Sequence, residues 1–224
     1  MPVLDLTLRT LPPGELELIR AAADSATAPH NLGDVSSYHR TFWYDLASAP
    51  RCLVEEIVRE RLQALIAPDI RKSAAGVEWW LGRLVAPYGP NFEFGVHRDQ
   101  GEHPLTGALE SPMLSSVLYL TTVDDGPLVV FPDQPELSDE HKELFFPLAN
   151  AYARFPGHLY HAVLSRVQLG APVRTPSEQR VRLTLLVNWW LYRPTSFAPA
   201  PMKLVAADYD GSIYPQLRVA LASA

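Results

Sequence analysis

Hydrophobic and polar positions divide the chain into a helical first third and a strand-rich remainder. Residues 13–24 have partial helical periodicity, with apolar side chains at Leu16 and Ile19. The pattern is stronger over residues 49–66, where apolar side chains recur every four or five positions at Leu53, Ile57, Leu62 and Ile66. We therefore predict two helices, the second of which ends before Pro68.

From residue 77 onward, the pattern changes to short segments rich in β-branched and aromatic residues, bounded by Gly, Pro or Asp. These predicted strands lie at residues 77–85, 93–96, 115–121, 128–131, 151–155, 161–167 and 181–190. Helices followed by strands predict an α+β fold that is mainly β. The number of strands predicts a double-stranded β-helix, the cupin-like jelly roll, with the N-terminal helices packed on it.

The length of 224 residues and the hydrophobic content of 47% are typical of one globular domain. We predict a single domain over residues 1–224. Within it, we expect residues 1–75 to be helical N-terminal support, residues 77–193 to be the jelly-roll core, and residues 194–224 to be a C-terminal extension.

Charge and composition limit the function classes. The formal net charge is −6, whereas a nucleic-acid surface needs a basic stripe. The single cysteine, Cys52, excludes an intramolecular disulfide and suits a reducing compartment. The chain opens without the features of a secretory signal, and no apolar run reaches the roughly 18 residues of a membrane span. We expect a soluble, cytoplasmic protein with no nucleic-acid or membrane partner, and the oligomeric state stays open.

The apolar segment 92–96 ends at the triplet His97-Arg98-Asp99. Side chains two positions apart on a strand point the same way, so the imidazole and the carboxylate are predicted to face one point. With one further histidine, they would form a 2-His-1-carboxylate ligand set. This set is typical of non-haem Fe(II) oxygenases because it leaves metal positions open.

Two histidines can supply the third ligand, since His158 and His161 both follow Phe155-Pro156-Gly157. We favour His161, because it begins a β-rich segment that would hold its imidazole in place, whereas His158 falls in the turn. A zinc site built from both histidines is the alternative. Zinc would need two further nitrogen or sulfur ligands, and the chain has no cysteine pair.

Segment 180–186 offers two arginines, Arg180 and Arg182, on one face of a predicted strand whose other face is apolar. An arginine in such a strand is costly unless it has an anionic partner. A buried guanidinium can bind a carboxylate such as that of 2-oxoglutarate through two parallel hydrogen bonds. We expect one arginine to serve as the anchor and the other to lie at the exposed start of the strand.

Five segments resemble, in the same order, those of the 2-oxoglutarate/Fe(II)-dependent dioxygenase superfamily. They are residues 94–99, 117–121, 126–132, 155–163 and 182–190. The resemblance spans about residues 77–193 and is greatest to the prolyl-hydroxylase-like and aspartyl/asparaginyl-hydroxylase-like branches. It implies that His97, Asp99 and His161 ligate the iron.

The resemblance also implies roles in co-substrate binding. Tyr119 matches a tyrosine that often hydrogen-bonds the carboxylate of 2-oxoglutarate. Arg182 matches the anchoring basic residue, with Arg180 as the alternative. The chain departs from the family in the 21 positions from His161 to Arg182, which exceed the usual compact hairpin and predict an extended loop over residues 168–179.

We therefore expect an enzyme that uses Fe(II), 2-oxoglutarate and O2 to hydroxylate a C–H bond, with release of succinate and CO2. A peptide, a protein side chain, an amino acid or a small natural product would be the substrate. The alternatives are a cupin-like metal-binding protein and a metal enzyme that does not use 2-oxoglutarate. The pairs Trp79-Trp80 and Trp189-Trp190 either contact the substrate or belong to the core.

Overall fold

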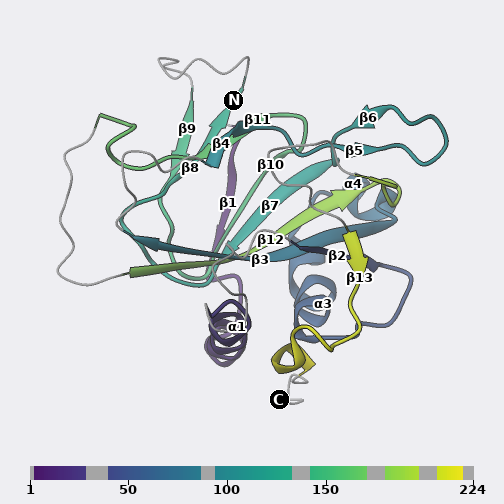
Figure 1. The fold of residues 1–224 in the computed structure, drawn as a ribbon, viewed down its shortest axis with the longest axis horizontal. Helices are drawn as coiled ribbons and strands as arrows, with labels where there is room; N and C mark the ends of the chain where they lie inside the picture. Colours follow the sequence, from purple (N-terminus) through teal and green to yellow (C-terminus); the bar gives the residue numbers. More distant parts are fainter. Residues whose placement is uncertain are drawn as a thin grey trace.

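The computed structural model describes residues 3–28, 40–86, 94–132, 142–170, 180–196 and 206–218. Its centre consists of two β-sheets that pack face to face, and the helices lie on the outer side of the larger sheet (Figure 1). Apolar side chains of β7 (Leu114–Tyr119) and β8 (Leu128–Phe131) meet between the two sheets. This arrangement is the predicted mainly β jelly roll.

Within the described residues, the larger sheet has seven strands in the order β1-β10-β7-β12-β3-β2-β13. Besides β7, these are β1 (Asp5–Leu8), β10 (Ala151–Pro156), β12 (Arg180–Trp190), β3 (Gly76–Ala86), β2 (Thr41–Asp45) and β13 (Ala206–Asp208). All neighbours are antiparallel except β13, which runs parallel to β2. Because β12 pairs with β3 along its whole length and with β7 on its other side, it forms the middle of the sheet.

The smaller sheet has the order β4-β11-β8-β9 in the part of the chain that the structure describes. Its other strands are β4 (Phe94–His97), β11 (Tyr160–Val163) and β9 (Glu143–Phe145). A separate hairpin of β5 (Gly101–Glu102) and β6 (Leu109–Glu110) projects beside the open end of the two sheets (Figure 1).

The outer face of the larger sheet is covered by helices. They are α1 (Pro13–Ala26), α3 (Leu53–Ile57), the π-helical turn η1 (Val58–Leu62), the 3-10 turn η2 (Gln63–Leu65), α4 (Pro68–Ser73) and the 3-10 turn η3 (Pro215–Arg218). Ile19 of α1 and Ile57 of α3 are fully buried in one core with Leu185 and Trp189 of β12. This packing confirms that the N-terminal helices support the sheet.

Strand β12 has one apolar face and one face that carries several polar residues. Its residues 183, 185, 187 and 189 are apolar and pack toward the helices. Its even-numbered residues therefore face the space between the sheets, because successive strand side chains point to opposite faces. Arg182, Thr184 and Asn188 are among them, and each is at most 2% exposed. A row of polar side chains thus enters an otherwise apolar interior.

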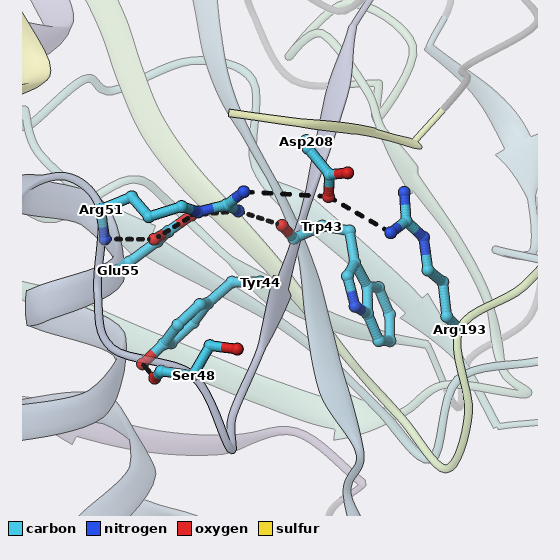
Figure 2. A network of polar contacts seen from close by, with 7 residues as sticks. All are labelled: Trp43, Tyr44, Ser48, Arg51, Glu55, Arg193 and Asp208. Atoms are coloured by element: carbon cyan, nitrogen blue, oxygen red, sulfur yellow. Dashed lines mark hydrogen bonds and ion pairs between the residues drawn. The ribbon is translucent and has the colours of Figure 1, made fainter. Parts of the chain in front are cut away.

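A polar network at the edge of the larger sheet holds β13 against β2 and α3 (Figure 2). Arg51 forms an ion pair of 2.8 Å with the fully buried Glu55, and it also donates a 2.5 Å hydrogen bond to the carbonyl of Trp43. Asp208 of β13 contacts Arg51 at 3.8 Å and Arg193 at 3.2 Å. These contacts fix the backbone that carries Trp43.

Several elements differ from those predicted. Strand β2 was not among the predicted strands, and neither were β1 and β13, which form the two edges of the larger sheet among the described residues. The predicted helix over residues 49–66 is shorter and changes to π and 3-10 geometry after Ile57. The predicted strand over residues 161–167 ends at Val163, because the Gln168 side chain accepts a 2.7 Å hydrogen bond from the amide of Ser165 and closes a turn.

The loop predicted over residues 168–179 lies mostly outside the described residues, which resume at Arg180. In the segments that the structure describes, no helix is long and apolar enough to span a membrane.

Candidate metal centre

Two neighbouring strands of the smaller sheet place the three predicted ligands together. His97 ends β4, Asp99 follows two residues later, and His161 lies on β11. His97 and His161 are direct cross-strand partners, so the antiparallel pairing brings the two rings to a centroid distance of 4.4 Å. One nitrogen or oxygen atom from each of the three residues lies within 4.8 Å of the others.

The ring nitrogens that face the carboxylate are both Nε2. His97 Nε2 lies 3.9 Å from Asp99 Oδ1, and His161 Nε2 lies 3.6 Å from Asp99 Oδ2. These separations are too long for hydrogen bonds, and they leave room for a small ion between the three groups. The arrangement therefore has the spacing of a ligand set.

Backbone carbonyls orient both imidazole rings. His97 Nδ1 lies 2.7 Å from the carbonyl oxygen of Gly95, and His161 Nδ1 lies 3.2 Å from that of Leu159. A ring whose Nδ1–H donates to a carbonyl has its Nε2 lone pair available for a metal. Both histidines therefore present the ligating nitrogen to the same point.

Burial sets the protonation state of His161. Its desolvation, with a smaller effect from His97, lowers its pKa to about 4. The imidazole is therefore neutral near pH 7, which is the form that binds a metal. Ser115 of β7 donates a 3.0 Å hydrogen bond to Asp99 Oδ2, so the carboxylate is also fixed by a neighbour.

His158, the alternative ligand, is exposed in the turn before β11 and does not belong to the cluster of described metal-ligating groups. The three-residue set of two nitrogens and one carboxylate oxygen fits an open six-coordinate ion such as Fe(II). Among the described residues, no fourth ligand of the kind that a closed structural zinc site requires belongs to this cluster.

A second group of polar side chains lies on the inner face of the larger sheet. Arg182 is 1% exposed, and its guanidinium carbon lies 5.5 Å from the ring centroid of Tyr119, which is fully buried. Thr184 is the cross-strand partner of Tyr119 and is also fully buried. Among the described residues, the Thr184 hydroxyl has no hydrogen-bond partner. A buried cation and a hydroxyl can together bind an anion such as a carboxylate.

Of the two arginines that the sequence offered, the structure describes the side chain of Arg182, and that side chain is buried. Arg180 pairs with Ala86 at the first position of β12, and its side chain lies outside the described part of the structure. Thr184 was not predicted as a site residue. The signal for it is the spacing of two from Arg182, which places both side chains on one strand face.

Glu78 was also missed by the sequence analysis. It lies on the inner face of β3 and is 2% exposed. Its Oε2 accepts hydrogen bonds from Trp190 Nε1 at 3.3 Å and Asn188 Nδ2 at 3.5 Å. Burial, followed by the charge of Asp99, raises the pKa of Glu78 to about 8. Asn188, the cross-strand partner of Glu78, pairs on its other side with Ser115, which is bonded to Asp99, so Glu78 lies on the same face of the sheet as the candidate metal centre.

The tryptophan pairs divide between the two faces of the larger sheet. Trp79 and Trp189 are fully buried in the core beneath the helices. Trp80 packs with apolar residues on the inner face, and Trp190 faces Glu78 there. One member of each pair is therefore in the core beneath the helices, as the sequence alternation allows, and the other lies on the inner face of the sheet.

No protein-family model matches the sequence, and no curated protein matches it significantly. Solved structures do match the fold. A prolyl-4-hydroxylase from Pseudomonas putida has 20% sequence identity and a TM-score of 0.52, with coverage of 84% of this chain and 92% of that one. AviO1 from Streptomyces viridochromogenes Tue57 has 16% identity and a TM-score of 0.51, with coverage of 88% and 92%. These likenesses show that the fold is shared over nearly the whole length of both structures.

Proposed function

We propose that this protein is an Fe(II)- and 2-oxoglutarate-dependent oxygenase that hydroxylates a C–H bond. The convergence of His97 Nε2, His161 Nε2 and the Asp99 carboxylate on one point carries the proposal. The shared fold with a prolyl-4-hydroxylase supports it. The proposed substrate is a peptide, a protein side chain, an amino acid or a small natural product.

The three ligands would hold Fe(II) on one side and leave its other side open to small molecules. When bound, the iron supplies the redox chemistry that couples reduction of O2 and decarboxylation of 2-oxoglutarate to oxidation of the substrate. The overall reaction converts 2-oxoglutarate, O2 and a C–H compound into succinate, CO2 and the corresponding alcohol. One oxygen atom enters succinate and the other enters the alcohol.

The chain itself binds, orients and shields the reactants. Arg182 would form charge-assisted hydrogen bonds to the distal carboxylate of 2-oxoglutarate, and the Thr184 hydroxyl would donate one more. Both side chains are buried, so water competes weakly for the anion and the interaction is stronger than at a surface. Ser115 keeps the Asp99 carboxylate turned toward the two imidazoles.

An equilibrium titration of 2-oxoglutarate into the Fe(II)-loaded protein under anaerobic conditions tests the proposal without knowledge of the substrate. We expect Arg182→Leu to weaken binding by about a hundredfold, because it removes a charge-assisted pair. Arg180→Leu, a charge-matched change two positions away, is expected to leave the affinity nearly unchanged. If the wild-type protein binds Fe(II) but no 2-oxoglutarate, the chain is instead a metal-binding protein or a metal enzyme of another type.

A further inference from the structure

Glu78 is a buried acid that the proposed reaction does not use. In the described residues, no ion pair involves its carboxylate, and the groups that hydrogen-bond it, the side chains of Asn188, Trp190 and Thr41, are all neutral donors. A buried carboxylate without a cation is costly, as the rise in its pKa to about 8 reflects. A partner with a positive charge would remove this cost and favour the ionised form of the carboxyl group.

Glu78 belongs to a row of side chains that crosses the inner face of the larger sheet. Ser115 of β7 pairs with Asn188 of β12, Asn188 pairs with Glu78 of β3, and Glu78 pairs with Trp43 of β2. Since neighbouring strands are about 4.8 Å apart, the row runs about 10 Å from Ser115 to Glu78. Ser115 is bonded to Asp99, so the row begins at the metal centre.

Trp43 closes the far end of this row. Its ring packs on Gly76, where an added Cβ would lie 2.3 Å from the indole Cζ2. The guanidinium of Arg193 lies 5.8 Å from the ring centroid on the outside, and the network of Figure 2 holds the Trp43 backbone in place. The Glu78 carboxyl is therefore enclosed between the candidate metal centre and a fixed aromatic wall.

We propose that Glu78 is a specificity-determining residue that binds a basic nitrogen of the substrate, an amine or a guanidinium, with Asn188 as the adjacent hydrogen-bonding group. This inference rests on the proposed oxygenase function and names its substrate class. It assigns a basic site for the co-substrate at Arg182 and an acidic site for the substrate at Glu78.

The position of Glu78 separates it from the co-substrate anchor. Asn188, the cross-strand partner of Glu78, lies six residues beyond Arg182 on β12, a span of about 20 Å. 2-Oxoglutarate, a five-carbon diacid, is too short to extend from Arg182 to Glu78. The Glu78 end of the row, on the side where Ser115 and Asp99 meet it, is therefore left for a second molecule.

Charge balance points to a cationic second molecule. With Fe(II) and 2-oxoglutarate bound, the charges of the metal, Asp99, Arg182 and the co-substrate dianion cancel. Ionised Glu78 then leaves one negative charge uncompensated in a site of low dielectric constant. A protonated amine or guanidinium neutralises that charge, whereas a neutral isostere leaves it unpaired.

Two fragment probes of nearly equal shape test this inference: n-butylguanidinium, which is charged, and N-butylurea, which is neutral. Calorimetry would measure the binding of each to the protein loaded with Fe(II) and 2-oxoglutarate without oxygen, and to the metal-free protein, at pH 8.5. We expect the wild-type protein to bind the guanidinium at least about tenfold more tightly than the urea. In Glu78→Gln, which keeps the shape and removes the charge, the ratio is expected to fall to about one.

Two further variants separate recognition from structural support. Glu78→Asp keeps the charge on a shorter side chain and is expected to retain the preference for the guanidinium. Glu143→Gln removes a carboxylate from β9, where it accepts hydrogen bonds from the amides of Val3 and Leu4, and is expected to leave the ratio unchanged. A ratio near one in the wild-type protein, no measurable guanidinium binding, or an unchanged ratio in Glu78→Gln would overturn the inference.

Failure of the oxygenase proposal has a different signature. If the oxygenase proposal fails, the Fe(II)-loaded protein will not bind 2-oxoglutarate. The Glu78 variants are not expected to change 2-oxoglutarate binding, so the two failures can be told apart. The ratio of the two probes in the metal-free protein would still decide whether Glu78 binds a cation.

Discussion

Replacing Glu78 by glutamine is expected to stabilise the metal-free protein, and the gain should increase with pH. The folded protein holds the Glu78 proton with a pKa of about 8, compared with the usual 4.5. Because the folded state binds this proton more tightly than the unfolded chain does, the contribution of Glu78 to stability is greatest below pH 4.5. It is lost as the pH rises from 4.5 to about 8.

The size of the effect follows from the two pKa values. Each pH unit in this interval lowers the free energy of unfolding by about 1.4 kcal/mol. The loss is then about 3 kcal/mol at pH 7 and about 5 kcal/mol above pH 8. Glutamine stays neutral and can still accept the hydrogen bond from Trp190, so Glu78→Gln avoids this loss. Total stabilities of domains are about 5 to 15 kcal/mol, which makes the change easy to measure.

Urea unfolding of both proteins in the presence of a chelator, at pH 5, 7 and 9, measures the difference directly. We expect the advantage of Glu78→Gln to be small at pH 5 and largest at pH 9. Glu55→Gln serves as a matched control, because Glu55 is also buried but is paired with Arg51. That variant is expected to lose about 1 to 2 kcal/mol at pH 7. A difference between wild type and Glu78→Gln that does not change with pH would refute the reasoning.

Three further predictions concern single contacts. Ser115→Ala removes the hydrogen bond to Asp99 and should weaken Fe(II) binding by about 10- to 100-fold in a metal titration; an unchanged affinity would contradict this role. Thr184→Val removes a buried, unpartnered hydroxyl and should stabilise the metal-free protein by about 1 kcal/mol while weakening 2-oxoglutarate binding by about tenfold. A Thr184→Val variant that binds 2-oxoglutarate as tightly as the wild-type protein would contradict the proposed contact. Gly157→Ala should destabilise the protein by about 1 to 3 kcal/mol in urea unfolding, since its Cβ would lie 2.2 Å from the Pro112 carbonyl oxygen; wild-type stability would show that the turn can move.

Local pattern was sufficient to predict much of the fold. The two-residue alternation of β12 and the aromatic, β-branched composition of β3 and β8 identify strands without knowledge of their partners. The same alternation places Arg180 and Arg182 on one face. It cannot tell which arginine is buried, because depth between two sheets depends on where the strand enters the sheet. The structure shows that Arg182 is buried.

Strands that depend on distant partners escaped prediction. Strand β2 is short, and its stability comes from pairing with β3 on one side and β13, more than 160 residues away, on the other. Glu78 escaped for a related reason. A glutamate between apolar residues can face solvent or the interior, and only the register with Asn188 and Trp43 places it in the interior.

The clustering of His97, Asp99 and His161 was partly predictable, because two of the three residues are close together in the sequence. His97 and Asp99 are two residues apart at a strand end, so the sequence nearly determines their relation. His161 required the pairing of β11 with β4, which the sequence does not contain. Its β-rich context distinguished it from His158, and the structure places His161 beside His97 and leaves His158 exposed.

The most direct test of the proposed function is the visible absorption spectrum of the metal-free protein after anaerobic addition of Fe(II) and 2-oxoglutarate. The account predicts a weak charge-transfer band that requires both additions and is lost in His97→Ala, because chelation of 2-oxoglutarate needs iron held on the open side of His97, Asp99 and His161. Iron binding without such a band would contradict 2-oxoglutarate chelation at this site, and a failure to bind iron would contradict the oxygenase proposal as a whole.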